Sequence, residues 1–261
     1  MFKTFIAFIL FSAVGPWAMA TDVNPKALSE SSETQSFDPL AKDTFSFREP
    51  SLNDLAARVS LWGTYYYLPQ INDVTGNISL RDMKSMELGP QLSLKDWCNS
   101  AMEGSVRIMS KSGEVRTYNY AGVTTENPVD CKKIFKHDVS KTKFREARGP
   151  YGDGLGEIIL APYRTLATDN SKIPIGTVLY IPSARGAKIS LSSGRVIIHD
   201  GYFFAGDKGG AIKDNHIDVF IGTHTSAPFF PWIKSNQEKT FEAYIVTDKK
   251  IISELTDLHN P

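Results

Sequence analysis

Short strand-like runs rich in apolar residues dominate the second half of the chain. The runs are GEIILAPYRTLATD, GTVLYIPS, GRVIIHDGYFFAGD, HIDVFIG and FEAYIV, and they are separated by glycine, proline, asparagine and serine. Short apolar runs between turn residues are typical of strands, and short strands at close spacing favour a barrel over a doubly wound sheet. Further upstream, SLWGTYYYLP is rich in aromatic residues and predicts another strand.

Residues 72–152 have a more mixed pattern. The stretch SLKDWCNSAME predicts a helix with Ser93 as its N-cap and Asp96 three residues later. The stretch GSVRIMSKSGEVRTYNYAG predicts a hairpin of two strands joined at Lys-Ser-Gly. Just before this region, LNDLAARV predicts a short helix capped by Ser51. The predicted fold class is therefore mainly β, with an α+β region that is inserted into a barrel or appended to it.

The N-terminal segment differs from the rest of the chain. Residues 1–20 combine Lys3, a short apolar run and the motif Ala-Met-Ala, which predicts a signal peptide cleaved after Ala20. An uncleaved anchor is the alternative. Residues 21–50 are rich in Ser, Thr, Glu and Pro without a sustained period, which predicts a flexible arm. We expect a periplasmic or secreted protein without a stable membrane anchor.

The charge balance limits the possible partners. Lys and Arg together number 29, Asp and Glu also number 29, and the formal net charge is zero. Such a chain has no global field that attracts nucleic acid or anionic membranes, so we expect no nucleic-acid partner. Hydrophobic residues make up 41% of the chain, which is enough for the core of one large domain or two small ones. We expect a monomer in which any electrostatic binding depends on local groups.

The two cysteines, Cys98 and Cys131, both lie in the mixed region. In an oxidising compartment such a pair is expected to form a disulfide, here closing a loop of about 34 residues, which stabilises by about 4 kcal/mol in the chain-entropy model. The number and spacing of the thiols exclude a Cys-x-x-Cys redox pair and a zinc site. Two separately buried free thiols are the alternative.

Asp218 interrupts the otherwise apolar strand HIDVFIG. Ile217 and Val219 share one face of such a strand, whereas His216 and Asp218 share the other, so Asp218 points away from the apolar row. A carboxylate in this position is costly unless it is paired, solvated or used in chemistry. The histidines near it match no strong metal-binding spacing, and the glycine-rich stretches lack the strand and helix that nucleotide binding requires. We therefore expect neither a metal nor a cofactor.

Two stretches together resemble a known family. TLATDNSKIPIGTVLYI, followed by AGDKGGAIKDNHIDVFIG, is similar to the three-aspartate (3D) domain of the membrane-bound lytic transglycosylase A family and of related cell-wall enzymes. The pattern is an Asp before a Pro-x-Gly-Thr strand entry, a second Asp before Gly-Gly-Ala-Ile-Lys, and a third in the next strand. Here these residues are Asp169, Asp207 and Asp218. GTYYYLP also resembles the Tyr-Tyr-x-x-Pro strand that begins the barrel in such enzymes, and the close match covers residues 156–222.

The resemblance implies a six-stranded double-psi β-barrel. Residues 51–71 would form its first segment and residues 153–261 the remainder, which carries the three aspartates. Residues 72–152 would form the inserted region. In the transglycosylases the glycan runs in the groove between barrel and insertion, so peptidoglycan glycan strands are the expected partner.

The resemblance also implies an activity. These enzymes cleave the MurNAc–GlcNAc β-1,4 bond of peptidoglycan and leave a 1,6-anhydro-muramyl end. Ordinary glycosidases use two carboxylates and water, whereas a lytic transglycosylase needs one residue that acts first as acid and then as base. Asp218 matches that residue and would need a raised pKa, supplied by poor solvation and a nearby like charge. Asp207 and Asp169 match the other two catalytic aspartates.

Further residues near the match are candidates for contact with the substrate. Tyr65 and Tyr66 are expected to stack on a sugar or to form hydrogen bonds with it, although aromatic strand residues also serve as core. Lys213 and the backbone of Gly209 and Gly210 are expected to shape the turn between the second and third aspartates.

One position departs from the family pattern, because Asp214 stands where glycine usually follows Ala-Ile-Lys. If the position requires a left-handed backbone, Asp tolerates it better than most residues. The extra carboxylate could also raise the pKa of Asp218 further. Two other functions stay open: a non-catalytic glycan-binding module on the same barrel, and a hydrolase that uses the same carboxylates with water.

Overall fold

The computed structural model describes residues 38–72, 76–126, 129–156, 158–191, 193–223 and 230–260. In chain order its helices and strands are α1 (Pro39–Lys42), β1 (Leu55–Tyr66), β2 (Gln70–Asn72), β3 (Ile78–Arg81), β4 (Glu87–Leu92), α2 (Leu94–Glu103), β5 (Ser105–Met109), β6 (Val115–Val123), β7 (Thr142–Glu146), β8 (Thr165–Ala167), β9 (Val178–Tyr180), β10 (Lys188–Ser190), β11 (Val196–Ile198), β12 (Tyr202–Asp207), β13 (His216–Phe220), β14 (Phe241–Val246) and α3 (Lys249–His259).

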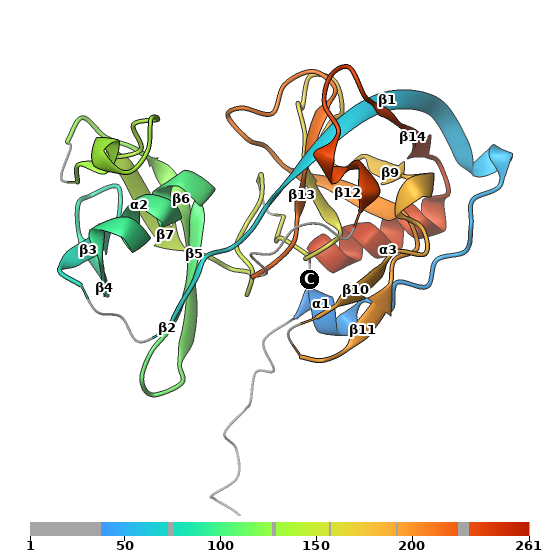
Figure 1. The fold of residues 1–261 in the computed structure, drawn as a ribbon. Coiled ribbons are helices and arrows are strands. Elements are labelled where there is room, and N and C mark those ends of the chain that lie inside the picture. The colour runs from blue at the N-terminus through green and yellow to red at the C-terminus, as the bar shows by residue number, and fades with distance from the viewer. Residues whose placement is uncertain are drawn as a thin grey trace, which may run out of the picture. The chain divides into compact units, whose positions relative to one another are not determined.

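Six strands close into a barrel in the order β1, β13, β8, β12, β9, β14 (Figure 1). β1 runs parallel to β13 and β8 runs parallel to β12, while the other neighbours are antiparallel. In each parallel pair the two strands are separated in sequence by other strands of the barrel. This crossed, mixed topology confirms the predicted six-stranded double-psi barrel in a mainly β chain.

Alternation along the barrel strands separates an inward face from an outward face. The inward set forms one buried cluster and includes Leu61, Leu166, Leu179, Phe203, Ile217, Val219 and Ala243. The outward set packs against Ile251 and Leu255 of α3 and includes Val178, Tyr180, Tyr202 and Phe204. β9 and β12 thus bury both faces, because α3 covers a side that would otherwise be exposed.

The residues between β1 and β8 form further sheets outside the barrel. β2, β5, β6 and β7 make a four-stranded sheet, and β3 pairs with β4. The predicted hairpin is confirmed, because β5 and β6 pair in antiparallel register. The predicted helix cap is also confirmed: α2 begins after Ser93, whose Oγ accepts a hydrogen bond from the backbone of Asp96 at 3.2 Å.

The helix predicted after Ser51 is wrong. Only a 3₁₀ turn forms, at Leu52–Asp54, and β1 already begins at Leu55. The cause is tertiary, because Val59 and its neighbours pair with β14 and the local helical preference of LNDLAARV is overridden.

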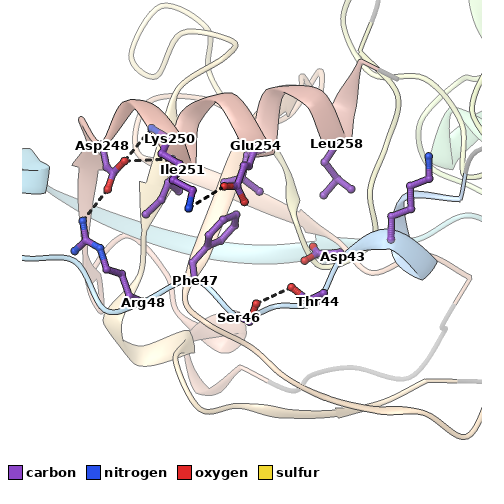
Figure 2. Close-up of a pocket in the computed structure, with 12 residues that line it drawn as sticks. Asp43, Thr44, Ser46, Phe47, Arg48, Asp248, Lys250, Ile251, Glu254 and Leu258 are labelled. Carbon is purple, nitrogen blue, oxygen red and sulfur yellow. Dashed lines mark hydrogen bonds and ion pairs between the residues drawn. The ribbon is translucent and has the colours of Figure 1, made fainter.

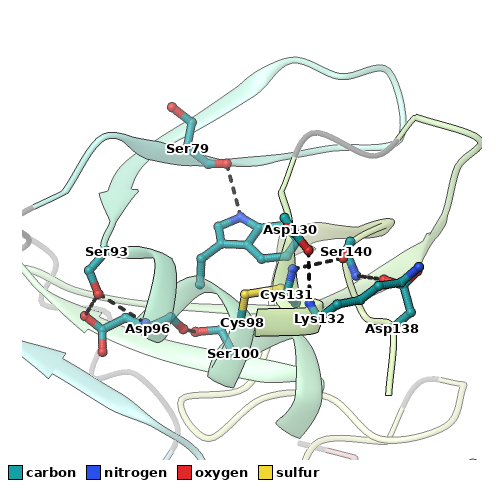
Figure 3. The surroundings of a disulfide bond; sticks show 11 residues. Ser79, Ser93, Asp96, Cys98, Ser100, Asp130, Cys131, Lys132, Asp138 and Ser140 are labelled. Atoms are coloured by element: carbon teal, nitrogen blue, oxygen red, sulfur yellow. Dashed lines mark hydrogen bonds and ion pairs between the residues drawn. A yellow bond between two sulfur atoms is a disulfide. The ribbon is translucent and has the colours of Figure 1, made fainter. Parts of the chain in front are cut away.

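Cys98 and Cys131 form the predicted disulfide, which joins α2 to the 3₁₀ helix Cys131–Lys133 (Figure 3). Both cysteines are fully buried in a cluster with Trp97. The indole Nε1 of Trp97 donates to the carbonyl of Ser79 at 3.3 Å. Together these contacts fix the position of α2, whose last residue is Glu103.

Residues 38–50 are part of the fold, so the prediction of a flexible arm over residues 21–50 is wrong for this portion. Phe45 is only 5% exposed and belongs to the barrel core cluster. The phenolic oxygen of Tyr202 donates to the backbone carbonyl of Arg48 at 3.0 Å. Residues 21–37 and the predicted signal peptide at residues 1–20 lie outside the described residues.

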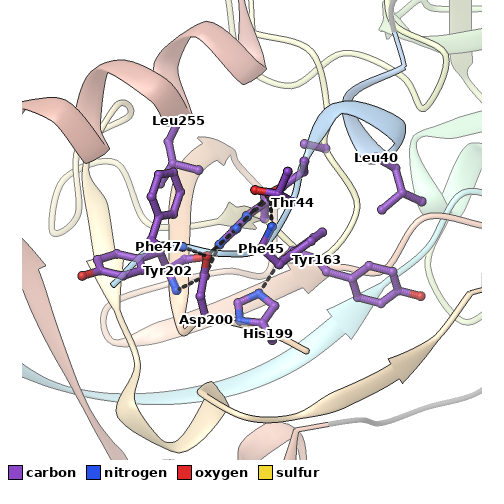
Figure 4. A network of polar contacts seen from close by, with 12 residues as sticks. Leu40, Thr44, Phe45, Phe47, Tyr163, His199, Asp200, Tyr202 and Leu255 are labelled. Atoms are coloured by element: carbon purple, nitrogen blue, oxygen red, sulfur yellow. Dashed lines mark hydrogen bonds and ion pairs between the residues drawn. The ribbon is translucent and has the colours of Figure 1, made fainter. Parts of the chain in front are cut away.

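Arg164, directly before β8, fastens this N-terminal segment to the barrel. Figure 4 shows the polar network around one of its partners, Asp200, beside Phe47 and Tyr202. The Arg164 guanidinium is fully buried and donates to Asp43 at 2.5 and 3.0 Å and to Asp200 at 2.5 and 2.8 Å. The same group lies 4.2 Å from the centre of the Phe45 ring. Asp200 also accepts from the backbone N–H of Phe47 at 3.0 Å. A buried cation is thereby matched by two carboxylates from distant parts of the chain.

A cavity of about 430 Å³ lies between the N-terminal segment and α3 (Figure 2). At one end, Arg48 pairs with Asp248 at 2.7 Å, and Asp248 caps the first turn of α3. This ion pair adds a second attachment of the segment to the barrel domain. No helix among the described residues has the length and apolar character needed to cross a membrane.

Replacing Arg164 by Met is expected to lower the free energy of unfolding by roughly 3–5 kcal/mol, because two buried carboxylates lose their cation. Urea unfolding at neutral pH measures the change. Arg58→Met is the matched control: its pair with Glu242 leaves the two side chains 68% and 55% exposed, so the loss should stay within about 1 kcal/mol. Equal losses for both variants would contradict the structural role of Arg164.

Candidate active site

Asp218 lies in the middle of β13 on its outward face, as the alternation predicts. Ile217 and Val219 point into the barrel core, and the parallel register places Asp218 opposite Thr64 of β1. The Thr64 hydroxyl lies 2.9 Å from Oδ1 of Asp218 and donates to it when the carboxyl is ionised. The carboxyl group is half-buried and faces a cavity at the barrel surface.

Asp207 is the last residue of β12 and lines the same cavity. Its Oδ2 accepts a hydrogen bond from the Tyr66 hydroxyl at 2.8 Å, and its Oδ1 accepts one from the backbone N–H of Lys208 at 2.8 Å. Tyr66 and Asp207 come from β1 and β12, which are not neighbours in the barrel, so the contact depends on barrel closure. The structure thus brings the second and third aspartates together.

Both carboxyl groups hold their protons more tightly than ordinary aspartates. Burial raises the pKa of Asp218 to about 7, the hydrogen bond from Thr64 opposes the rise, and the charge of Asp207 adds to it. Burial also raises the pKa of Asp207 to about 6, against hydrogen bonds from Lys208 and Tyr66. At neutral pH, therefore, Asp207 is mainly ionised while Asp218 keeps a substantial protonated fraction. Asp214 is not among the groups that shift the pKa of Asp218.

Asp169 stands apart from this pair. It follows β8, and its Oδ2 accepts from the backbone N–H of Asp214 at 2.9 Å while its Oδ1 binds Ser171. The hydrogen bond from Asp214 and those from Ser171 lower its pKa to about 2. Asp214 has a φ of 54°, which is the left-handed backbone expected at the position where the family has glycine. Asp169 therefore holds the turn between β12 and β13 rather than facing the cavity.

The cavity beside Asp218 has a volume of about 680 Å³. Of the predicted substrate-binding residues, Tyr65, Tyr66, Gly209 and Gly210 line it. Lys213 lines an adjoining cavity of about 680 Å³ that shares Tyr66, Gly209 and Gly210 with the first. Gly209 is required by space, because a Cβ there would lie 2.6 Å from Ile212. The two cavities together form the groove that we refer to as the site groove.

Glu103, the last residue of α2, lines both parts of the site groove and was not predicted from the sequence. Burial raises its pKa to about 7, a hydrogen bond with the backbone of Tyr67 opposes the rise, and the charge of Asp218 adds to it. One local signal was available: a glutamate in the last turn of a helix is unfavourable beside the helix dipole. Its position opposite the barrel aspartates is a tertiary feature that no local pattern contains.

Another acidic residue that lines the site groove, Asp153, holds a turn of the backbone. Asp153 is buried, and its carboxylate accepts from Arg145 at 2.5 Å and from the backbone N–H groups of Arg148 and Gly149 at 3.0 Å each. Its hydrogen-bonding capacity is used within the turn that precedes β8. It holds that turn and is not poised for proton transfer.

Residues 164–229 match the family model of the 3D domain. The match covers the three aspartates and confirms the resemblance noted in the sequence. It extends over about a quarter of the chain, from the start of β8 to beyond β13. A search of curated proteins found no match.

The fold is similar to several solved structures. These include MltA of E. coli with bound chitohexaose (18% identity, 71% of each chain, TM-score 0.48). A membrane-bound lytic murein transglycosylase from Agrobacterium tumefaciens is 15% identical over 76% of this chain and 77% of its own, with a TM-score of 0.47. The lytic transglycosylase LtgG of Burkholderia pseudomallei is 17% identical over 74% and 73%, with a TM-score of 0.39. At these identities, the roles of individual residues have to come from the geometry of the site.

Asp218→Asn is expected to stabilise the protein above pH 7. The raised pKa means that the folded state loses stability as pH rises from about 4 to about 7 and stays at the lower level above that. Replacing the titrating carboxyl should raise the free energy of unfolding by up to about 4 kcal/mol at pH 8 and change it little at pH 4.5. Urea unfolding at the two pH values measures the difference, with the exposed Asp257→Asn in α3 as control. If the difference in unfolding free energy between variant and parent were the same at both pH values, the pKa of Asp218 would not be raised in the folded state.

Proposed function

We propose that the protein is a peptidoglycan lytic transglycosylase that cleaves the MurNAc–GlcNAc β-1,4 bond and leaves 1,6-anhydro-MurNAc ends. The observation that carries the proposal is the Asp218 carboxyl, which lies in a groove and retains a proton near neutral pH. The match of its surroundings to the 3D domain supports the same reaction class. An activity on the cell wall also agrees with the exported location that the N-terminal sequence predicts.

In the first half of the reaction, protonated Asp218 acts as general acid. A pKa of about 7 places the group where it can donate to the glycosidic oxygen at neutral pH. The bond between the muramyl C1 and that oxygen breaks, the proton leaves with the departing sugar, and positive charge develops on C1 and the ring oxygen. Asp207, ionised and close by, stabilises this charge electrostatically.

In the second half, the Asp218 carboxylate acts as base. It removes the proton from the muramyl C6 hydroxyl, and the C6 oxygen attacks C1 of the same sugar to close the anhydro ring. The carboxyl is protonated again, so the cycle needs no external proton and no cofactor. Asp169 contributes indirectly, because it holds the turn that links Asp207 to Asp218.

The site groove suits a glycan strand. It is lined by Tyr65 and Tyr66 from the barrel and by Met102 from α2, which offer aromatic and apolar surface to sugar rings. Lys208 and Lys213 add hydrogen-bond donors along the same groove. These residues are the proposed contacts to the substrate.

Hydrolysis is a second candidate, and Glu103 favours it. Ordinary glycosidases place a second carboxyl group across the scissile bond, where it activates water or attacks the sugar. Glu103 lines the same cavity as Asp218 from a different part of the fold. If it orients a water molecule, reducing ends rather than anhydro ends are formed.

Digestion of purified peptidoglycan followed by mass spectrometry of the products tests the proposal. Anhydro-muropeptides, lighter than the hydrolytic products by one water, are expected from the parent protein. Asp218→Asn should lose at least about 10²–10⁴-fold in rate, since it removes the proton that the acid step transfers. Asp207→Asn should also lose activity, although less completely.

The control is Asp257→Asn, which changes an exposed aspartate outside the groove and should retain the parental rate. Asp153→Asn is unsuitable, because it disrupts a buried ion pair. Release of anhydro-muropeptides by Asp218→Asn at near the parental rate would exclude the acid/base assignment. Retained binding to peptidoglycan without any cleavage by the parent would favour a glycan-binding module instead.

Glu103→Gln separates the two catalytic candidates. If Glu103 activates water, the variant should lose reducing-end products by at least about 100-fold, the lower end of general-base effects, and the anhydro fraction should rise. For a transglycosylase, the product pattern should stay wholly anhydro. Quantifying both product classes in one chromatogram decides between the outcomes.

A further inference from the structure

Two polar side chains, Thr64 and His216, lie in a row behind the candidate acid. The Thr64 hydroxyl is 2.9 Å from Oδ1 of Asp218 on one side and 2.7 Å from Nε2 of His216 on the other. The parallel register of β1 and β13 produces this row, because Thr64 pairs with Asp218 while Trp62 pairs with His216 two residues earlier. His216 is only 8% exposed, and its side chain has no role in the reaction steps above.

The ring of His216 is held in one orientation. It stacks on the indole of Trp62 with 3.5 Å between ring centres and 3° between planes. The backbone of Ala211 favours the protonated ring and so opposes the lowering of the His216 pKa, which indicates that its carbonyl oxygen faces a ring nitrogen. Since Nε2 contacts Thr64, Nδ1 is left to donate to Ala211. Burial lowers the pKa of His216, which keeps the ring neutral at pH 7.

This arrangement determines where the threonine proton points. A neutral imidazole with its proton on Nδ1 presents a lone pair at Nε2, and a hydroxyl has a single proton to donate. When Thr64 donates to Nε2, its oxygen can only accept at the side of Asp218. The Thr64 oxygen can then accept a hydrogen bond from a protonated Asp218 carboxyl group. An ionised carboxylate has no proton to donate, so the two oxygens repel each other.

We infer that His216 is a positioning residue that acts through Thr64 to keep Asp218 in its protonated form between catalytic cycles. The inference rests on the proposed function for its purpose, but the proton coupling itself is a property of the folded protein. After Asp218 gives up its proton, the Thr64 hydroxyl can rotate and donate to the carboxylate, and it can return when Asp218 is protonated again. One rotatable hydroxyl thus serves both halves of the reaction.

Other groups also face Asp218, and none of them replaces this coupling. Asp207 at the end of β12 acts on it through its charge, and Tyr66 of β1 donates to Asp207 instead. Glu103 of α2 interacts with Asp218 electrostatically. Thr64 is the group that forms a direct hydrogen bond with the carboxyl, so its proton has the strongest local influence.

The test is an NMR titration of the Asp218 carboxyl carbon, assigned by comparison with Asp218→Asn. His216→Phe keeps the stacked ring but removes the acceptor at Nε2, so the Thr64 hydroxyl becomes free to donate to the carboxylate. The pKa of Asp218 should then fall by about one unit, which lowers its protonated fraction at pH 7 about fivefold. Thr64→Val removes the donor, so the pKa should rise by a similar amount, and Thr64→Ser should restore the parental value.

The double variant Thr64→Val/His216→Phe provides the decisive comparison. If His216 acts only through Thr64, the double variant should titrate like Thr64→Val alone, whereas independent effects would add. A merely structural role of His216 would lower stability without moving the titration in these opposite directions. If His216→Phe fails to fold, the ¹⁵N shifts of His216 in the parent still decide, because a proton on Nε2 in place of Nδ1 would overturn the inference.

These readouts do not depend on catalysis. A protein without activity on peptidoglycan would contradict the proposed function, while the titrations would still show whether the two residues are coupled. An active protein whose Asp218 titrates identically in His216→Phe would contradict the coupling and leave the proposed function standing. In the active case, the basic limb of the kcat/KM profile should shift with the measured titration.

Discussion

The parallel pairing of β1 with β13 joins residues 62–66 to residues 216–220 and is the contact on which both the barrel and its site depend. It closes the barrel between two segments about 150 residues apart, so its formation carries the entropic cost of closing a long loop. The same register puts Thr64 beside Asp218 and Trp62 beside His216. Barrel closure also brings Tyr66 to Asp207, which lies on a strand that β1 does not touch. Closure of the barrel and assembly of the site therefore depend on the same strand pairing.

This assembly has an energetic cost, because it removes two neighbouring carboxyl groups from water. The raised pKa values of Asp207 and Asp218 are the measure of that cost. The surrounding fold offsets it with the apolar barrel core and with a second apolar layer between α3 and the outward face of β9 and β12. It also contains a buried charge cluster of the opposite kind, in which Arg164 is matched by two carboxylates. The charges around Arg164 are paired with one another. The carboxyl groups of Asp207 and Asp218 are buried without a cation, as expected at a site of proton transfer.

The sequence was most informative where a local period and a motif agreed. The alternation around Asp218 correctly assigned Ile217 and Val219 to the core and the carboxyl to the opposite face, and the turn signals placed the barrel strands. It failed where partners are distant. The composition of residues 38–50 indicated disorder, yet Asp43 and Phe45 are held by Arg164, more than 100 positions away. Glu103 and the contact from Thr64 to His216 were missed for the same reason.

Three aspartates that belong to one sequence motif thus occupy three electrostatic environments. Asp169 lies on a turn, accepts several hydrogen bonds and has a pKa of about 2. Asp207 lies at the end of a strand, where one backbone donor and Tyr66 partly compensate its burial. Asp218 lies in mid-strand, where the backbone amides are committed to the sheet and only a side-chain hydroxyl can reach it. Burial raises the pKa of Asp207 and Asp218, and the position of each residue relative to its strand sets how many backbone donors oppose that rise; together they order the three pKa values. An acid that keeps its proton at neutral pH is therefore expected in the strand, and a permanently ionised residue on the turn.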